Sequence, residues 1–353
     1  AGAGNIDVLI VSGANPVHTM PAASGFADAL ARVPMIVSLS SFMDDTTALA
    51  HVVLPSHTDL ESWGDHAPEP GVGFRVAAIS QPVVAPLFDT RPTGDIVLGL
   101  ARELGLGGGL DAADMHEYIR RGWLDIYRRG GAADDDGFDE FWRSVLRAGV
   151  WGDETRSDNT SVSVSPDAIA PTGGELLGDD SALAFLPYLS HGFRDGRGAN
   201  LPWMQELPDP MTRVVYGSWV ELNPETAREL GIDEGELVEI SSEHGTISAP
   251  ALIYPAIMPG VVAMPIGQGH GEFGRYARNR GANPLQIVSP DADAASGELA
   301  WSATRITLNP TGRRAPLLST SGTPRDLGRD IVRTTGGNAH AKLRGIPITV
   351  ERA

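Results

Sequence analysis

The chain has 353 residues, of which 20% are charged and 42% are hydrophobic, so it is long enough for two or three domains with buried cores. Its formal net charge of -18 argues against nucleic acid or anionic lipid as a general partner, although a local basic site can still hold an anion. The absence of cysteine excludes disulfides and cysteine-bound iron–sulfur clusters in this chain, and no apolar run approaches the roughly 20 residues that span a bilayer.

Residues 1–107 alternate short apolar runs with segments of helical spacing. The runs typical of buried strands are "DVLIVS" (7–12), "MIVSLSSF" (35–42) and "HVVLP" (51–55). Helical spacing occurs at residues 21–31 and 94–105. Strands and helices that alternate in this way predict an α/β lobe with a parallel, doubly wound sheet.

Residues 108–200 predict a connecting segment that is partly helical and partly irregular. Residues 115–129 and 138–147 have the apolar spacing of amphipathic helices. Residues 151–201 are rich in Ser, Asp, Gly and Pro, which indicates a long and mostly irregular connection.

Residues 201–353 alternate apolar runs with tight turns, which predicts a compact β-barrel. One short helix is expected at "NPETARELG" (223–231). Asn223 is suited to cap its start, Pro224 to its first helical position and Gly231 to its end.

Two groups of candidate site residues follow the first two predicted strands. Gly13 and Asn15 lie in "VSGANP", and Ser38, Leu39 and Ser40 lie in "SLSSF". The carboxyl ends of parallel strands share one edge of a sheet, where α/β folds bind ligands. The alternatives are a tight strand-to-helix turn for the first group and helix-capping serines for the second. The fingerprint G-x-G-x-x-G is absent, which argues against NAD.

A His and carboxylate cluster occurs in "HTDLESWGDH" (57–66), but its spacing matches no pair of metal ligands on a helix. We therefore predict a hydrogen-bonding corner there and no metal site.

The stretch "PIGQGHGEFGRYARNRGANP" (265–284) is basic and rich in glycine. Its glycines leave the backbone open to a partner, and Arg275, Arg278 and Arg280 offer the paired donors that suit phosphate. The alternative is a solvated loop whose arginines pair with some of the 45 acidic residues of the chain.

Several motifs occur in an order that is similar to one known family. They include "VLIVSGANPVHTMP", "DTRPTGDIVLGLARELG", "VELNPETARELGIDEGELVEISSEHGTI" and "GRYARNRGANPLQIVSP". Together they resemble the C-terminal half of a molybdopterin oxidoreductase of the dimethyl sulfoxide reductase family. "RGANLPWMQELPDP" (197–210) most resembles the molybdopterin-like subunits of quinone-linked complexes, of the alternative complex III, menaquinone reductase and polysulfide reductase types.

The resemblance implies a nucleotide-binding-like α/β lobe, followed by a double-psi-type β-barrel, and a molybdopterin guanine dinucleotide between them. Gly13, Asn15 and Pro16 would face its guanosine diphosphate arm, and Ser38, Leu39 and Ser40 its guanine or ribose. The family more often has Asp at the position of Ser40. The barrel loop that meets the pterin would contribute Gly267, Gln268, Gly269, His270, Tyr276, Arg278 and Asn283.

The function implied is part of the large subunit of a membrane-associated, quinone-linked electron-transfer complex on the extracytoplasmic (periplasmic) face of a bacterial membrane. Its partners would be the remainder of the large subunit, an iron–sulfur subunit and a membrane-anchor subunit. The family's cluster-binding Cys motif and molybdenum ligand are absent, so no catalytic residue is assigned and iron–sulfur clusters are expected only outside this chain. The alternatives are a cofactor-free scaffold that docks the iron–sulfur and membrane subunits, and a separate nucleotide-binding protein with a barrel lid.

Overall fold

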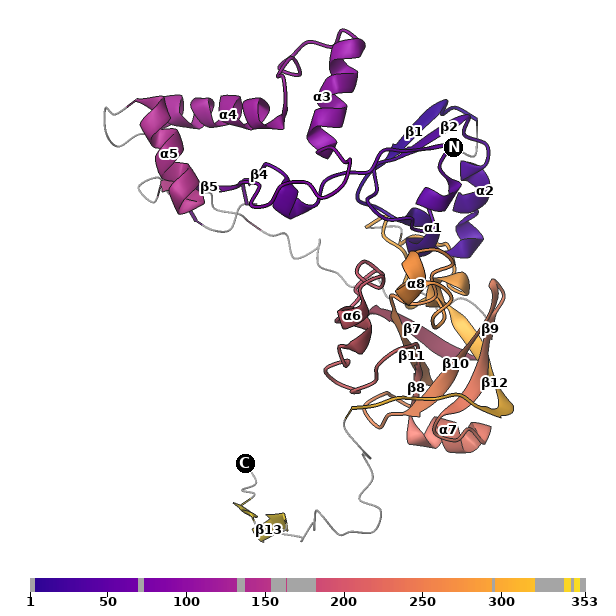
Figure 1. Ribbon diagram of the computed structural model, residues 1–353. Coiled ribbons are helices and arrows are strands. Elements are labelled where there is room, and N and C mark those ends of the chain that lie inside the picture. The colour runs from indigo at the N-terminus through magenta and orange to yellow at the C-terminus, as the bar shows by residue number, and fades with distance from the viewer. Residues whose placement is uncertain are drawn as a thin grey trace.

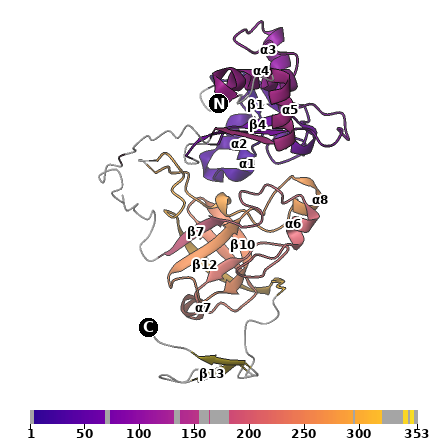
Figure 2. The same cartoon turned by 90° about the vertical axis from the view of Figure 1, so that its left-hand side faces the viewer.

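The computed structural model describes residues 4–68, 73–131, 137–153, 163, 182–293, 296–320, 340–343 and 346–349. Within them the chain forms an α/β lobe, a second small sheet with its own helices, and a closed barrel (Figure 1). In Figure 2 the lobe lies above one end of the barrel. No helix in these ranges has both the length and the apolar character needed to cross a membrane.

The lobe contains a parallel sheet in the order β1 (Val8–Val11), β2 (Met35–Ser38) and β3 (Val52–Val53), which confirms the predicted strands. Its connections contain α1 (Pro16–Thr19), η1 (Ala22–Ser24), α2 (Phe26–Leu30) and η2 (Thr47–Leu49). Leu30, Val33 and Ile36 form the core between these helices and the sheet.

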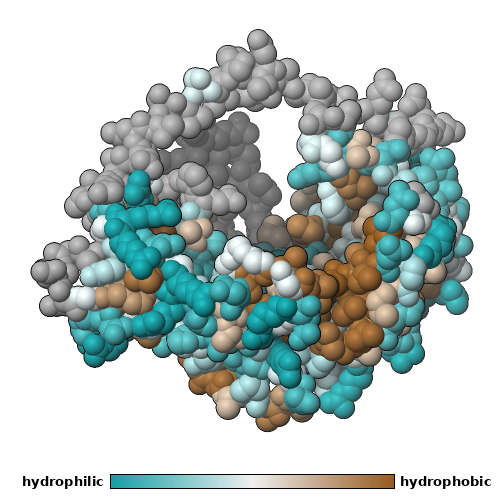
Figure 3. Space-filling model, turned by 90° about the horizontal axis from the view of Figure 1, so that it is seen from above, coloured by the Kyte–Doolittle hydropathy of each residue, from teal (hydrophilic) through white to brown (hydrophobic). Residues whose placement is uncertain are grey.

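The other face of this sheet is open to solvent at Val8 and Ile10, which are 56% and 45% exposed. It faces α3 (Thr93–Glu103) across a hollow of about 1010 Å³. Seen from above, hydrophobic residues gather in a patch on this side of the molecule (Figure 3). A doubly wound sheet has helices on both of its faces. Here α3 lies on the second side of the sheet, but the hollow separates it from the strands.

A second, antiparallel sheet contains β4 (Gly64–His66), β5 (Arg75–Ser80) and β6 (Val150–Asp153). It packs with the predicted helices, observed as α4 (Met115–Ile126) and α5 (Phe138–Ala148), around Trp123 and Trp142. The short helices η3 (Asp59–Glu61) and η4 (Tyr127–Gly131) adjoin it. This sheet was not expected, because the paired residues of β5 and β6 are more than 70 positions apart in the chain.

The predicted barrel is confirmed as a closed barrel in the order β10-β8-β11-β7-β12-β9, with β9 paired back to β10. Its strands are β7 (Leu183–Leu189), β8 (Val220–Leu222), β9 (Glu236–Ser242), β10 (Gly245–Ile253), β11 (Val261–Ile266) and β12 (Arg305–Arg314). Phe185, Val220, Ile240 and Met264 are among the residues that fill it.

β7 lies within residues 108–200, which the sequence assigned to the connecting segment. The apolar run "LAFLPYL" pairs with β11 and β12, so the barrel begins before residue 201. Most of the predicted irregular connection, residues 154–162 and 164–181, lies outside the described ranges.

Short helices occur in the connections between the barrel strands: α6 (Pro202–Glu206), α7 (Pro224–Leu230), α8 (Gly274–Ala277) and η6 (Pro284–Gln286). The predicted cap of α7 is confirmed, because the Asn223 side chain accepts a hydrogen bond from Glu225 N. β13 (His340–Leu343) and β14 (Ile346–Thr349) form a separate antiparallel pair outside the barrel, although the sequence counted them with it.

Candidate functional site

The loop of residues 265–284 docks the barrel onto the lobe. Gly271 N and Glu272 N donate to Asp45 Oδ1 at 2.7 and 2.9 Å. Asn283 Nδ2 donates to the backbone oxygen of His18 at 2.8 Å. These bonds join α1 and the loop after β2 to the barrel. The lobe and the barrel therefore share one polar interface, which we call the seam.

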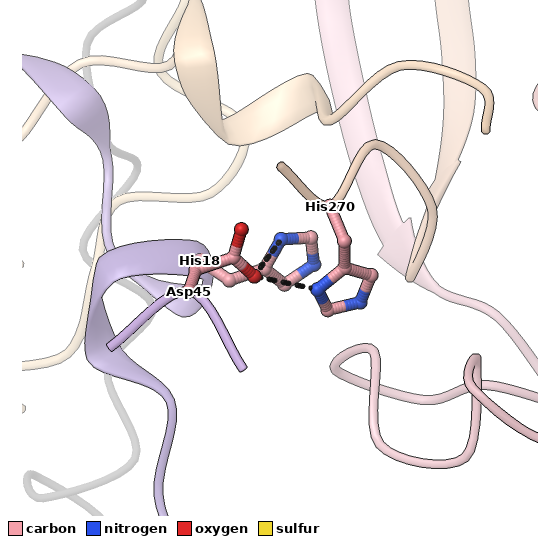
Figure 4. A group of neighbouring side chains, drawn as sticks. All are labelled: His18, Asp45 and His270. Carbon is pink, nitrogen blue, oxygen red and sulfur yellow. Dashed lines mark hydrogen bonds and ion pairs between the residues drawn. The ribbon is translucent and has the colours of Figure 1, made fainter. Parts of the chain in front are cut away.

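The Asp45 carboxylate is the centre of this seam. Its Oδ2 accepts from His270 Nδ1 at 2.7 Å (Figure 4). The same oxygen accepts from Asn15 Nδ2 at 3.1 Å. Burial raises the pKa of Asp45, but the hydrogen bonds from His270, Glu272 N and Asn15 outweigh it and hold the pKa well below its ordinary value. Asp45 is therefore ionised, and it fixes the proton of His270 on Nδ1.

His18 and His270 stack face to face beside Asp45, with ring centroids 3.6 Å apart and an interplanar angle of 11°. They are only 3% and 2% exposed. Burial and the neighbouring His270 lower the pKa of His18 to about 3, so it is neutral at neutral pH.

The Nε2 atoms of both imidazoles are sealed from solvent and have no hydrogen-bond partner among the described residues. Buried polar atoms are almost always paired, so two adjacent exceptions indicate where a ligand or water would complete the site.

Residues 195–197 form a turn that covers these Nε2 atoms. A Cβ added to Gly196 would lie 2.8 Å from His18 Nε2 and 2.9 Å from His270 Nε2, and the φ of Gly196 is +111°. Only glycine fits so close to the rings in this left-handed conformation. We refer to these residues as the 195–197 turn.

A pocket of about 380 Å³ lies beside the imidazole pair, between the lobe and the barrel. Its walls combine hydroxyl groups, carboxylates, two phenyl rings and one guanidinium, which suit the ribose, base and phosphate groups of a nucleotide. Its lining includes Gly13, Asn15, Ser38, Leu39, Ser40, Asp44, Asp195, Arg197, His270 and Phe273.

The structure thus brings together predicted residues from both strand ends and from the barrel loop. Several of their polar side chains already form hydrogen bonds with other groups of the protein. Asn15 Oδ1 accepts from Thr46 N at 3.0 Å, and Ser38 Oγ lies 2.8 Å from Thr47 Oγ1. Ser40 Oγ donates to the Phe42 carbonyl at 2.8 Å and lies 3.3 Å from Asp44 Oδ2. Asp44 thus supplies a carboxylate next to the position where the family usually has one.

Other predicted residues lie outside the pocket lining. Pro16 begins α1, and Gly267 packs against Phe193. Gln268 donates from its amide to Gln205 Oε1 at 2.8 Å. The Cβ position of Gly269 would collide with the backbone of Asn283.

The basic residues of the loop have partners within the loop itself. Arg278 is 56% exposed and pairs with Glu272 at 3.2 Å. Arg275 Nη2 donates to Tyr276 Oη at 2.8 Å, and Arg280 Nε donates to the Tyr276 carbonyl at 2.8 Å. A role for Tyr276 and Arg278 in ligand binding therefore stays a prediction.

Sequence reasoning missed His18, Asp45, Asp195 and Arg197. No local spacing marks His18 or Asp45, because both owe their place in the site to residues of the barrel loop. Asp45 and its partner His270, for example, are 225 residues apart in the chain. Arg197 stood in a quoted motif, but its place at the pocket depends on the path of the chain after β7.

The cluster in residues 57–66 is a hydrogen-bonding corner, as predicted. His57 contacts the carbonyls of Glu61 and Thr90 through its two ring nitrogens, at 3.2 and 3.1 Å. Within the described ranges, the group close enough to hold a metal ion is instead His18, Asp45 and His270. One ligand atom from each of these residues lies within 4.8 Å of the others, but the Asp45 carboxylate already accepts hydrogen bonds from Asn15, His270, Gly271 N and Glu272 N.

Residues 202–304 match the family model described as Molydopterin dinucleotide binding domain. The menaquinone reductase, molybdopterin-binding-like subunit, of Nitratidesulfovibrio vulgaris is 28% identical over 300 residues, which cover 85% of this chain and 41% of that protein. The arsenate respiratory reductase molybdopterin-containing subunit of Shewanella sp. is 24% identical, with coverage of 84% of this chain and 43% of that protein.

Among solved structures, the fold is similar to that of acetylene hydratase from Pelobacter acetylenicus. The TM-score is 0.63 at 16% identity, and the match covers 86% of this chain and 44% of that one. The chain therefore spans less than half the length of each of these relatives. These matches and the ordered motifs show that the chain is similar to the C-terminal part of molybdopterin oxidoreductases of the dimethyl sulfoxide reductase family, the part that carries the dinucleotide-binding domain.

Proposed function

We propose that this chain is part of the large subunit of a membrane-associated, quinone-linked electron-transfer complex, and that its seam binds one guanosine arm of a molybdopterin guanine dinucleotide. The observation that carries the proposal is the pocket itself. It joins both predicted nucleotide-facing strand ends to a barrel loop that lies within the matched dinucleotide-binding domain.

The residues at the seam fit such a cofactor. Ser40 and Asp44 offer acceptors to ribose hydroxyls and base N–H groups, and Arg197 offers donors to phosphate. The unpaired Nε2 atoms of His18 and His270 lie next to the same pocket. When bound, the cofactor would supply the redox chemistry, while these residues bind and orient it and exclude water.

The finer fold assignment is part of the proposal. The barrel mixes parallel pairs, β8–β10 and β7–β11, with antiparallel pairs around the rest of its circumference. This mixture supports a double-psi-type barrel rather than a simple up-and-down barrel, in which all neighbours are antiparallel.

Further polypeptide of the large subunit is the proposed partner for the open face of the β1–β3 sheet. The hollow beside it is lined by Val8, Ile10, Leu54 and Leu100. An apolar surface of this kind is typical of an interface, and the relatives are more than twice as long as the matched region. We also propose that an iron–sulfur subunit and a membrane-anchor subunit are partners of this chain. The proposed location is the extracytoplasmic face of the membrane.

A cofactor-free scaffold is the second candidate. Arg278 pairs with Glu272 and Arg197 pairs with Asp195, which is how a former anion site would satisfy its own arginines.

Cofactor analysis of the purified native complex separates the two candidates. Bound cofactor predicts about one molybdenum atom per complex by mass spectrometry of metals, together with the fluorescence of oxidised pterin. A complex with neither molybdenum nor pterin would contradict the cofactor-binding proposal and leave the scaffold.

A further inference from the structure

The 195–197 turn holds an ion pair at the mouth of the pocket. Arg197 Nε donates to Asp195 Oδ1 at 2.8 Å, and Arg197 Nη2 donates to Asp195 Oδ2 at 2.7 Å. The side chain of Arg197 is 69% exposed, while Gly196 between the two residues rests on the buried imidazoles. The turn thus presents the Arg197 side chain to solvent, while its central glycine covers the unpaired Nε2 atoms.

The closed position of this turn is weakly held. An exposed ion pair contributes little to stability, because water and salt screen it. Beneath the turn, His18 Nε2 and His270 Nε2 stay unpaired only while Gly196 excludes solvent. The ion pair is internal to the turn and does not hold Gly196 against the rings, and lifting the turn would let both Nε2 atoms find hydrogen-bond partners.

The turn is also local in its backbone bonding. Gly196 N donates to the Phe193 carbonyl at 2.9 Å, and Ala199 N donates to the Gly196 carbonyl at 3.1 Å. Neither bond belongs to a barrel strand pair, since β7 ends at Leu189. The turn can therefore shift without opening the barrel.

The charges around the pocket indicate what would move it. Arg197 is the one Lys or Arg among the described residues that line the pocket, whereas Asp44 and Asp195 both contribute carboxylates. A nucleotide diphosphate would be repelled by these acids unless a guanidinium met it. Arg197 is the residue in reach, and its planar donors suit phosphate as well as they suit a carboxylate.

We propose that the 195–197 turn is an exchangeable anchor: Arg197 leaves Asp195 and binds the diphosphate of a nucleotide in the seam pocket, as Gly196 lifts from His18 and His270. This inference rests on the proposed function, because it takes the ligand to be a nucleotide arm. It assigns to Arg197 the phosphate contact and to Asp195 the role of holding Arg197 when the pocket has no diphosphate.

Calorimetric titration of the full chain with GDP, inorganic pyrophosphate and guanosine tests the anchor. In the R197Q variant, GDP and pyrophosphate should bind at least about tenfold more weakly, because a charge-assisted pair of hydrogen bonds is lost. Guanosine has no phosphate, so its binding should not change. These arms separate the diphosphate contact from contacts to the base and ribose.

A second variant is expected to change affinity in the opposite direction. D195N releases Arg197 and removes a like charge, so GDP should bind about three- to tenfold more tightly. The matched control is R314Q, which breaks the exposed ion pair of Arg314 with Asp233 on the barrel and should leave GDP binding unchanged. General unfolding would weaken binding in both D195N and R197Q.

Three results would overturn the anchor: wild-type affinity for GDP in R197Q, weaker binding in D195N, or no binding of GDP and pyrophosphate by the wild-type chain. Each can occur while the native complex still contains molybdenum and pterin. The anchor can therefore fail without the proposed function failing.

Discussion

The buried imidazole of His18 should make stability depend on pH. Its pKa is lowered from 6.5 to about 3 in the folded chain, so below pH 6.5 the unfolded chain binds a proton that the folded chain does not. The stabilisation is present above pH 6.5 and is lost as pH falls toward 3. One such proton changes the free energy of unfolding by about 1.4 kcal/mol per pH unit.

Urea unfolding of the wild type and of H18Q at pH 7.0, 5.5 and 4.5 measures this dependence. Wild-type stability should fall by roughly 2–3 kcal/mol more than that of the variant over this range, because the variant has no imidazole to protonate. H66Q is the control, since it removes an exposed histidine instead. Equal pH slopes in the wild type and H18Q would contradict the prediction.

At the residue scale, the sequence could locate the strand-end residues but not their partners. Gly13 and Ser40 follow apolar runs, so their place at one sheet edge follows from the alternation of strands and helices. His18 and Asp45 have no such signal. Their role depends on contacts of Asp45 with His270 and of His18 with Asn283, which join residues 225 and 265 positions apart in the chain.

The α7 helix offers a test at the scale of one element. Asn223 Oδ1 accepts from Glu225 N at 2.8 Å, and its Nδ2 donates to the Ile257 carbonyl at 2.6 Å. N223A removes both bonds and should lower the free energy of unfolding by about 1–2 kcal/mol, measured by urea denaturation.

N223S serves as the matched variant because its hydroxyl keeps a capping acceptor and removes the amide donor to Ile257. It should therefore lie between the wild type and N223A. If N223S were as unstable as N223A, the cap would contribute nothing and the contact to Ile257 would account for the whole effect.

Elements with local signals were predictable and elements that depend on pairing were not. α4, α5 and α7 have amphipathic spacing or caps that a short window reveals. β5 and β6 pair with each other only because the intervening helices fold back. β7 is apolar enough for a strand, but Ser, Gly and Pro in its surroundings conceal it within an irregular region.

At the scale of the whole molecule, Asp45 couples the lobe to the barrel. It sits in the lobe, yet three of its hydrogen bonds come from the barrel loop, through His270 Nδ1, Gly271 N and Glu272 N. The hydrophobic cores of lobe and barrel are separate clusters. Cooperative unfolding of the two parts therefore depends on this polar seam.

Replacement of Asp45 by Asn should uncouple the two parts. The new amide would place a donor against His270 Nδ1–H and Asn15 Nδ2–H, so buried donors would lose their acceptor at a cost of about 2–3 kcal/mol. Differential scanning calorimetry should then resolve separate transitions for lobe and barrel.

D44N is the control, because among the described residues the Asp44 side chain bonds to Thr47 N and Ser40, both within the lobe. It should destabilise the lobe without weakening its docking, and hydrogen exchange at Gly271 and Glu272 would distinguish the variants. A single transition in D45N, with protection of those amides unchanged, would show that another contact carries the coupling.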